Sequence, residues 1–423
     1  MTALRVLHQA YLRNGAWGGM EKSLVGFLAA TQADAEVENF LIENLRGAAP
    51  GMLDALSCLS APAREVRRWY GLPLPSSPPA LRRGHRRSAA TKWRVNRVIN
   101  WNQVGDADPA RLAHSLGAAA VYWERGSAWF TQVPRPDPEF ATAYDLYLAN
   151  SEASRQMLRQ RWKVQGDIQV CTPALSHRLD AAVPRTLKAD RPVRLGFAAR
   201  LRAFKGGVLA VHALRALVDR GIDAELWVAG EGPDLQAMQA QAEYLGLGSR
   251  VRFAGWVASM DDWFGDIDLM LHPALREPYG ISCAEALSRG IPVVATRVDG
   301  LSEVIEHGVD GLCVTPTLAL TAFDALGGDR NDVYPLVYRP ERGSIAEPGL
   351  PDPEALADAV MQIVGDASRY AAFSAAACAT VDGRFSYASH LQRLKSLLRG
   401  ARARSDAASS PLPTTAPVAK PIR

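Results

Sequence analysis

The segment from Glu277 to Gly308 carries two carboxylates, Glu277 and Glu285, spaced eight positions apart. Between them, the sequence Pro-Tyr-Gly forms a turn that opens a helix, and the first N–H groups of a helix are suited to bind an anion. Glu277 lies ahead of this helix and can accept hydrogen bonds from one set of hydroxyl groups. Glu285 lies just over a turn inside the helix and can accept them from another set. The layout suits a ligand with hydroxyls at both ends and a diphosphate in the middle, as in a nucleotide-sugar.

Arg200 and Lys205 form a second group of candidate residues, in the frame FAARLRAFKGG that follows a predicted buried strand. When a sugar leaves a nucleoside diphosphate, negative charge grows on the phosphates, and preorganised cations aimed at that charge lower the barrier. An arginine can contact two oxygens at once, while a lysine acts as a point charge. Taken alone, the pair fits a solvated cationic loop equally well. Its place after a strand and ahead of the two glutamates favours phosphate binding.

Together these motifs resemble those of the retaining glycosyltransferases of family 4, the group 1 glycosyltransferases. The E-x7-E pattern of that family falls on Glu277 and Glu285, and its R-x4-K pattern falls on Arg200 and Lys205. The resemblance implies that Glu277 contacts the donor sugar and that Glu285 contacts the ribose. It also implies the GT-B fold, two Rossmann-like domains facing a central cleft, and catalysis without a metal or other cofactor. The resemblance covers most of the C-terminal half and is weaker in the N-terminal half.

The same resemblance implies further donor-binding residues in the C-terminal half. Tyr279, Gly280 and Ile281 belong to the turn that opens the helix between the glutamates. Gly255 and Trp256, in the segment VRFAGWV, would lie near the nucleotide base, where Trp256 can stack. A partly buried surface position for Trp256 is an equally good interpretation.

In the N-terminal half, Gly18 and Gly19 follow the first predicted strand and precede an amphipathic helix, so a loop for the acceptor or the phosphates is expected there. The alternative is a simple turn. Glu124 ends a strand in VYWERGSAWF, and strand ends face the ligand crevice in such sheets. Related enzymes often have a histidine near this point, whereas this chain has Glu124 and Arg125. We therefore take Glu124 as a candidate on the active-site face.

Two other acidic positions are interpreted without a catalytic role. The sequence Asp266-Ile267-Asp268 has the form of a metal-binding DxD motif, but it precedes a buried strand, and Arg200 and Lys205 already supply the positive charge. No histidine cluster indicates a zinc site. We therefore expect no metal. Glu303 falls where the family keeps a carboxylate, and we expect it to be structural.

Apolar runs alternate with segments of helical period along the whole chain, which predicts an α/β protein. In the first half, strands are expected at Leu4–His8, Val37–Ile42, Ala119–Trp123, Asp145–Ala149 and Ile168–Cys171. The predicted organisation is an acceptor domain at 1–175, a linker at 176–192, a nucleotide-sugar domain at 193–384 with a surface-loop insertion at 315–351, a helix at 385–404 that crosses back to the N-terminal domain, and a disordered tail at 405–423.

The bulk composition is that of an ordinary globular protein. The 423 residues suit two domains, and the net charge of +4 argues against a general nucleic-acid binder. The five cysteines, without CxxC spacing, argue against a disulfide framework. Because neither a signal peptide nor a long apolar run is evident, we expect a cytoplasmic protein.

The stretch from Arg64 to Arg97 contains ten Lys or Arg residues and one acid, Glu65. Its part HRRSAATKWRVNRVINW has partly helical periodicity and is interpreted as a surface helix that docks on anionic lipid at the cytoplasmic membrane. A solvated basic loop and a patch for a phosphorylated acceptor are the alternatives. The candidate lipid contacts are Arg82, Arg83, Arg86 and Arg87.

The function expected from these residues is retaining transfer of a sugar from a nucleoside diphosphate donor to a glycan or lipid-linked acceptor, in the synthesis of surface polysaccharide or lipopolysaccharide. One alternative is a GT-B sugar-nucleotide epimerase, which needs acid and base groups that are not evident. Another is a catalytically silent subunit that binds nucleotide-sugar, against which the Arg200 and Lys205 pair argues.

Overall fold

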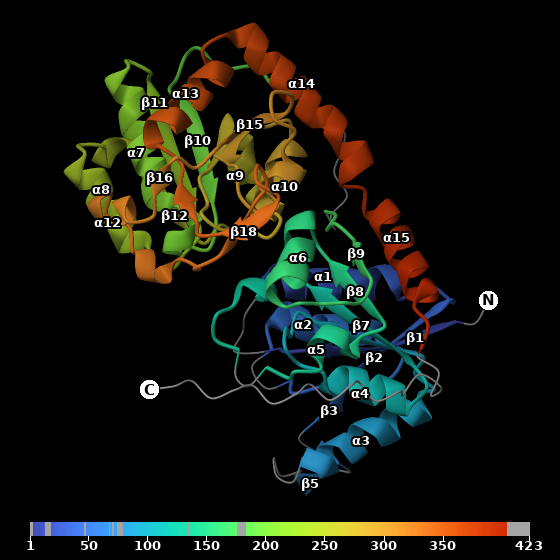
Figure 1. The fold of residues 1–423 in the computed structure, drawn as a ribbon. Coiled ribbons are helices and arrows are strands. Elements are labelled where there is room, and N and C mark those ends of the chain that lie inside the picture. The colour runs from blue at the N-terminus through green and yellow to red at the C-terminus, as the bar shows by residue number, and fades with distance from the viewer. Residues whose placement is uncertain are drawn as a thin grey trace, which may run out of the picture.

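Two parallel sheets, each covered by helices, form the two halves of the molecule in this computed structural model (Figure 1). The structure describes residues 3–12, 18–45, 48–66, 68–69, 72–73, 79–133, 136–175 and 183–403. The first part of the predicted linker, 176–182, and the predicted tail, 405–423, lie outside the described residues.

The N-terminal sheet has seven parallel strands in the order β3-β2-β1-β6-β7-β8-β9. Its central strands are buried on both faces, which explains their nearly continuous apolar sequences. The strands are β1 (Leu4–Ala10), β2 (Val37–Glu43), β3 (Arg64–Glu65), β6 (Arg97–Trp101), β7 (Ala119–Glu124), β8 (Leu146–Ala149) and β9 (Ile168–Val170). The five strands expected from the sequence are therefore present, with ends that differ by one or two residues.

The prediction of a surface helix through residue 101 was wrong in its second half. Helix α3 ends at Lys92, and the apolar run that follows is β6, which lies between β1 and β7 in the middle of the sheet. The arginines before this run hid a buried strand. The helices of this domain are α1 (Gly19–Thr31), α2 (Pro50–Asp54), α3 (Pro79–Lys92), α4 (Asp108–Ser115), α5 (Phe140–Ala143) and α6 (Glu152–Gln156), which continues as a π-helical turn over Met157–Arg161.

The C-terminal sheet has six parallel strands in the order β12-β11-β10-β13-β14-β15. They are β10 (Val193–Ala198), β11 (Ala224–Ala229), β12 (Val251–Gly255), β13 (Leu269–His272), β14 (Val293–Thr296) and β15 (Gly311–Val314). Its helices are α7 (Gly207–Asp219), α8 (Leu235–Tyr244), α9 (Met260–Asp266), α10 (Ile281–Leu287), α11 (Leu301–Val304) and α13 (Pro353–Val364). The strand order reverses between β10 and β13, and ligands bind at such a switch point in open α/β sheets.

The segment 315–351 is more ordered than the surface loop that the sequence predicted. It contains two short antiparallel pairs, β16 (Leu318–Ala319) with β19 (Gly349–Leu350) and β17 (Val337–Arg339) with β18 (Ser344–Ala346). It also contains the short helix α12 (Ala322–Ala325) and a 3-10 turn at Arg330–Asp332. It also reaches the N-terminal domain, because Gln160 accepts a hydrogen bond from the backbone N–H of Ile345 at 3.1 Å. The lack of periodicity reflected the shortness of these elements, not their absence.

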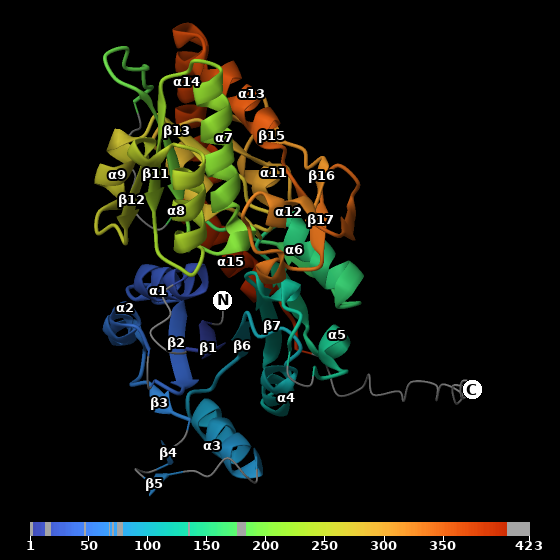
Figure 2. The ribbon, with the colours of Figure 1, turned by 90° about the vertical axis from the view of Figure 1, so that its left-hand side faces the viewer.

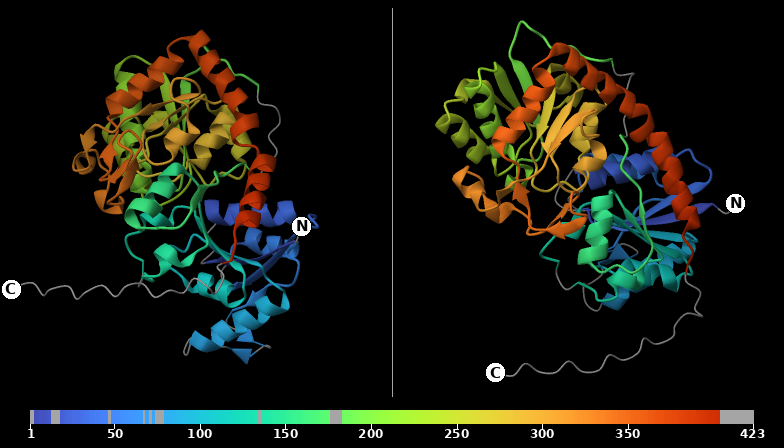
Figure 3. Two further views of the ribbon diagram at one scale, coloured as in Figure 1. Left: turned by 45° about the vertical axis from the view of Figure 1, so that its right-hand side comes forward. Right: turned by 45° about the horizontal axis from the view of Figure 1, so that its top comes forward.

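Two long helices close the chain, α14 (Ala367–Arg384) on the C-terminal domain and α15 (Tyr387–Gly400) along the N-terminal domain (Figure 3). The side chains of Leu394 and Leu398 are buried in the core of the N-terminal domain. Lys395 forms an ion pair with Asp34 at 2.5 Å. Helix α15 therefore ties the end of the chain to the first domain. Among the described residues, no helix is long and apolar enough to cross a membrane.

Candidate active site

Glu277 lies in the turn between β13 and α10, at the carboxyl end of the C-terminal sheet. Its Oε2 accepts a hydrogen bond from Lys205 Nζ at 2.6 Å and lies 3.0 Å from Nε2 of His272. Because a carboxylate only accepts, His272 Nε2 carries the hydrogen in this contact. Burial alone would raise the pKa of Glu277, but Lys205 and His272 outweigh it and hold the pKa well below its usual range. A negative charge is therefore fixed at this strand end.

Lys205 reaches Glu277 because Gly206 lets two loops approach closely. Gly206 has φ 74°, and a Cβ there would lie 2.0 Å from the carbonyl oxygen of Pro273. Only glycine fits this conformation and this contact. The lysine and glutamate side chains are 16% and 12% exposed, so the pair is shielded but open on one side.

Asp299 supports the Glu277 turn, and the sequence analysis did not select it. Its carboxylate accepts hydrogen bonds from the backbone N–H of Glu277 at 3.0 Å, from Trp129 Nε1 at 3.2 Å and from the backbone N–H of Tyr338 at 2.7 Å. Burial raises the pKa of Asp299 to about 7, although these donors act against the shift. The sequence signal that was available is the Asp-Gly pair after a strand. Aspartate is one of the few residues that tolerate positive φ, and Asp299 has φ 46°.

Arg276, next to Glu277, was also missed. Its buried guanidinium lies 5.0 Å from the ring centroid of Trp129 and 4.6 Å from that of Tyr334, and it donates to the carbonyl oxygen of Gly126. Trp129 and Gly126 belong to the N-terminal domain, and Tyr334 belongs to the 315–351 segment. Arg276 therefore joins three parts of the chain beside the site.

Arg200 and the start of α1 face each other across the two domains. Arg200 is exposed and has no ion-pair partner among the residues that the structure describes. Its Nη2 lies 3.8 Å from the position that a Cβ would take on Gly18. The N–H of Gly18 donates to Glu21 Oε2 at 3.0 Å, which caps the helix that begins at Gly19. The two glycines thus leave space next to Arg200, and Figure 2 shows α1 on the face that meets the C-terminal domain.

Glu285 lies in α10 and is close to the same face of α1. Burial raises its pKa, and the positive charges of Lys22 and Arg289 act against the shift. Lys22 belongs to the N-terminal domain, so both candidate glutamates have a cation opposite them. The structure therefore brings Glu277, Glu285 and Lys205 to one region between the domains.

The turn residues Tyr279, Gly280 and Ile281 connect Glu277 to Glu285. Gly280 has φ 105° and precedes α10, which begins at Ile281. Tyr279 is buried, and burial raises the pKa of its hydroxyl far above the usual value. Gly255 ends β12 with φ 64°, and the next side chain, Trp256, is 73% exposed. An exposed indole at a strand end is free to stack on a ligand.

Glu124 is fully buried and is committed to its own loop. Its carboxylate accepts hydrogen bonds from Tyr122 at 2.5 Å, from Ser127 Oγ at 3.0 Å, and from the N–H groups of Gly126 and Ala128. With four donors, it has little capacity left for a substrate. These hydrogen bonds shape the loop at the end of β7, and the expected place of Glu124 on the active-site face stays a prediction.

The carboxylates of Asp266 and Asp268 form ion pairs with neighbouring arginines. Arg191 donates to both oxygens of Asp268, at 2.6 and 2.8 Å, and Arg194 pairs with Asp266 at 3.0 Å.

Glu303 accepts hydrogen bonds from the N–H groups at the start of α6, Glu152 at 2.7 Å and Ala153 at 3.1 Å, and so links the domains. This position agrees with the structural role expected from the sequence.

Comparison with known proteins identifies the family that the C-terminal domain resembles. Residues 192–326 match the family described as glycosyl transferases group 1. This part of the chain is therefore similar to the group 1 glycosyltransferases. The lipopolysaccharide core biosynthesis glycosyltransferase LpsD of Rhizobium meliloti is 30% identical over 233 residues, which cover 53% of this chain and 64% of that protein. An uncharacterized glycosyltransferase of Methanocaldococcus jannaschii is 33% identical over 28% of this chain and 31% of its own.

Less than two thirds of each of these relatives is thus covered. Several proteins of known structure share the fold over nearly the whole chain. Anabaena HepE, solved with UDP and glucose, aligns with a TM-score of 0.66 at 19% identity, covering 94% of this chain and 99% of that one. A glycosyltransferase of Rickettsia africae aligns with a TM-score of 0.70 at 16% identity, covering 95% and 98%. The predicted fold class, GT-B with two Rossmann-like domains, is confirmed.

Proposed function

We propose that this protein transfers a sugar, with retention of configuration, from a nucleoside diphosphate-sugar to a glycan or lipid-linked acceptor. The observation that carries the proposal is the cluster of Lys205, Glu277 and His272 at the carboxyl end of β13. An ionised carboxylate there can orient sugar hydroxyls, and the adjacent ammonium can stabilise charge on a leaving diphosphate. The similarity of residues 192–326 to the group 1 glycosyltransferases supports the same reaction.

Each residue has a distinct role in the proposed reaction. Glu277 accepts hydrogen bonds from the donor sugar, and Lys205 and Arg200 bind the diphosphate. Glu285 accepts from the ribose hydroxyls, and the turn from Tyr279 to Ile281 positions the donor between them. The acceptor enters from the side of Gly18 and Gly19. The leaving phosphate takes the acceptor proton, so that no protein nucleophile is required, and no metal is needed in this scheme.

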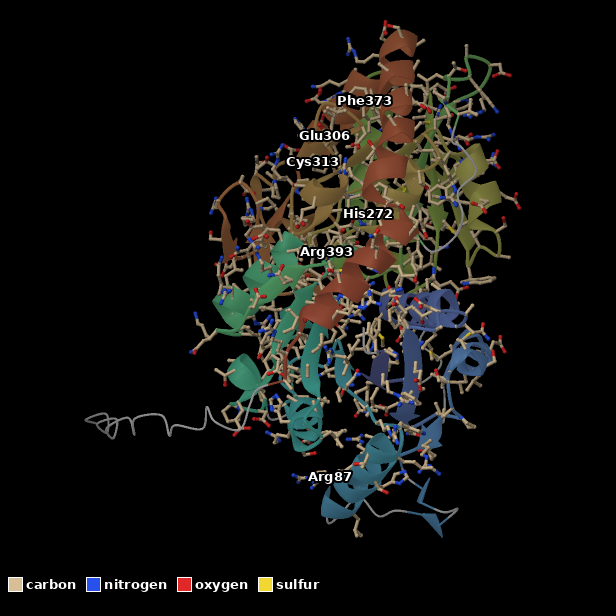
Figure 4. All side chains as sticks on the ribbon, turned by 90° about the vertical axis from the view of Figure 1, so that its right-hand side faces the viewer. Arg87, His272, Glu306, Cys313, Phe373 and Arg393 are labelled. Atoms are coloured by element: carbon tan, nitrogen blue, oxygen red, sulfur yellow. The ribbon has the colours of Figure 1, made fainter. Side chains whose placement is uncertain are left out.

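Lipopolysaccharide or surface polysaccharide synthesis is the pathway we propose, with the protein in the cytoplasm and α3 in contact with the membrane. The relative LpsD is named for lipopolysaccharide core biosynthesis, which supports this assignment. Helix α3 lies at the end of the N-terminal domain remote from the C-terminal domain, as Arg87 and His272 show in Figure 4. This position fits lipid contact better than binding of an acceptor in the cleft, because the helix is far from Glu277.

The test is a transfer assay with UDP-, GDP- and ADP-sugars, membrane extract as the acceptor source, and EDTA throughout. We expect one donor to give a labelled product, and NMR of the new linkage to show the anomeric configuration of the donor. An inverted linkage would contradict the proposed mechanism. A free epimeric nucleotide-sugar, formed without acceptor, would favour the epimerase alternative, and nucleotide binding without turnover of any donor would favour a silent subunit.

A further inference from the structure

Arg125 is a cation beside the Glu277 turn that the proposed reaction leaves without a role. It follows β7 directly, and so lies at the carboxyl end of the N-terminal sheet, where ligands bind. The next residue, Gly126, has φ 123° and packs against the Glu277 turn, because a Cβ there would lie 3.1 Å from Pro278 Cγ. The loop that carries Arg125 is therefore in contact with the turn that carries Glu277.

The guanidinium of Arg125 is anchored on one side only. Its Nη2 donates to Ser23 Oγ and to the carbonyl oxygen of Gly19 at 3.4 Å, both in the first turns of α1. The carbon of the guanidinium lies 5.2 Å from the ring centroid of Trp123. These contacts fix the plane of the side chain, since Arg presents its donors in a rigid fork.

The other side of the fork has no partner. Arg125 Nη1 is buried and makes no hydrogen bond with the residues that the structure describes. Arg125 also forms no ion pair with any residue that the structure describes. The carboxylate of the neighbouring Glu124 already accepts hydrogen bonds from four other donors. A buried N–H donor of a cation without a hydrogen-bond partner is costly, so Nη1 is expected to meet an anion in the complex.

The groups around Arg125 include two hydroxyls, a thiol and the carboxylate of Glu124. Burial lowers the pKa of Arg125 to about 10, and Cys171, Tyr387, Glu124 and Tyr279 act against this shift. Arg125 therefore stays protonated at neutral pH. Since Lys205 and Arg200 already serve the diphosphate in the proposed reaction, Arg125 is available for a different negative group.

We propose that Arg125 is a specificity-determining residue that binds a carboxylate or phosphate group carried by a sugar substrate. This proposal rests on the proposed glycosyltransferase function and deepens it, because it defines one substrate as an acidic or phosphorylated sugar. The unpaired Nη1 of Arg125 suits either anion, because carboxylate and phosphate oxygens both accept charge-assisted hydrogen bonds from a guanidinium. The acidic group can belong to the donor sugar or to the acceptor, and the two sources are separated by experiment.

The test uses titration calorimetry on the full chain. In the donor arm, UDP-glucuronate is compared with UDP-glucose. In the acceptor arm, the protein saturated with UDP is titrated with glucuronate, glucose 6-phosphate or glucose. We expect an acidic probe in one arm to bind at least about tenfold more tightly than its neutral counterpart, as hydrogen bonds to charged groups contribute about 1.5–3 kcal/mol. Arg125→Met should abolish this difference, and Arg125→Lys should retain part of it.

Two controls separate the outcomes. Arg83→Met, on exposed α3, should leave every affinity unchanged. Ser23→Ala removes an anchor of Nη2 and should weaken binding of the acidic probe several-fold without changing binding of UDP. Equal affinity of wild-type protein for acidic and neutral probes in both arms, or a loss of UDP binding itself in Arg125→Met, would overturn the proposal. Failure of wild-type protein to bind UDP, GDP or ADP would instead count against the glycosyltransferase function.

The thermal stability of the variant provides a second readout. An unpaired buried charge is retained for a ligand and not for the fold, so Arg125→Met should melt at the same temperature as wild type or higher. A melting temperature that falls by more than about 4 °C, the size of a 1 kcal/mol loss, would assign Arg125 to the fold instead.

Discussion

Glu277 keeps its negative charge in a shielded place because Lys205 and His272 contact the same oxygen. In the proposed reaction, the diphosphate of the donor attracts Lys205 as well, so the lysine can shift between the carboxylate and the phosphate. The pair thus prepares the site before the donor arrives. This preorganisation is the property that distinguishes charge stabilisation in a site from the same charges in water.

Lys205→Ala should lower the turnover number about 10²–10³-fold, the usual effect of losing one preorganised donor at a developing charge. The expected measurement is single-turnover transfer with saturating donor. Lys188→Ala, at an exposed position before β10, is the matched control and should react normally. A near-normal rate in Lys205→Ala would remove the lysine from the diphosphate site.

Glu303 makes stability depend on pH. Burial raises its pKa to about 7, although the N–H groups of Glu152 and Ala153 act against the shift. Between the ordinary value of 4.5 and about 7, the folded state holds a proton that the unfolded state releases. Stability is therefore greatest below pH 4.5 for this group, and it falls as the pH rises toward 7.

Glu303→Gln should flatten the decrease in melting temperature between pH 5 and pH 7.5, because glutamine does not titrate. The size of the effect is at most about 3 kcal/mol. Asp299, with a pKa of about 7, contributes a slope of the same sign, so a residual decrease is expected in the variant. Identical pH profiles of variant and wild type would contradict the assignment of Glu303.

The residues to which we assign catalytic roles were easier to select from the sequence than those that support them. Glu277, Glu285, Arg200 and Lys205 stand in spaced motifs. Asp299 has no such spacing, because its three donors come from parts of the chain far apart in sequence. The places of Arg276 and Arg125 could not be predicted either, because the sequence does not show whether an arginine side chain is buried or solvated.

At the scale of elements, the sequence predicted the sheets better than the segments between them. Strands buried on both faces, such as β7, have continuous apolar sequences and were identified. Strand β6 was missed because a basic helix precedes it and Arg97 opens it. The Arg97 side chain donates to the carbonyl oxygen of Leu398 on α15 at 2.6 Å, so the positive charge lies at a helix C-terminus and not on a lipid-facing helix.

Helix α3 remains the element that we expect to contact the membrane. Arg83 and Arg87 are exposed on it, together with Leu81 at 43% exposure. Replacing Arg82, Arg83, Arg86 and Arg87 by glutamine should lower the binding to phosphatidylglycerol vesicles at least tenfold, since each charge contributes about 1 kcal/mol. Vesicle sedimentation measures the change.

The matched control for α3 replaces exposed arginines of the C-terminal domain, Arg252 and Arg342, by glutamine. This variant should sediment with vesicles as wild type does. Equal sedimentation of the α3 variant and wild type would refute membrane contact through α3, and transfer to a soluble acceptor should be normal in both variants.

The 315–351 segment acts as an element that holds the domains together. Tyr334 packs on Arg276 at 4.6 Å and lies 5.3 Å from Phe204 and 6.3 Å from Phe130, measured to ring centroids. Tyr334→Ala should weaken this contact by about 1–2 kcal/mol and increase the radius of gyration of the free protein in X-ray scattering. Tyr244→Ala, 82% exposed on α8, is the control. An unchanged scattering curve would contradict a role in holding the domains.

At the scale of the whole molecule, the candidate site is assembled from both domains. Gly18, Lys22 and Trp129 come from the first domain, and Arg200, Glu285 and Asp299 come from the second. The connections that hold these groups in register include α15, the contact of Glu303 with α6, and the packing around Arg276. In the proposed reaction, we expect the two domains to close on the substrates and exclude water.

The central claim is that the C-terminal domain binds a nucleoside diphosphate between Glu277 and Glu285. Titration calorimetry with UDP, GDP and ADP tests it most directly, on wild type, Glu285→Ala and the control Glu243→Ala, an exposed glutamate on α8. We predict that one of the three diphosphates binds tightly, that Glu285→Ala weakens it at least about tenfold through the lost ribose contact, and that Glu243→Ala does not. Absence of binding to all three, or equal affinity in Glu285→Ala and wild type, would contradict the account.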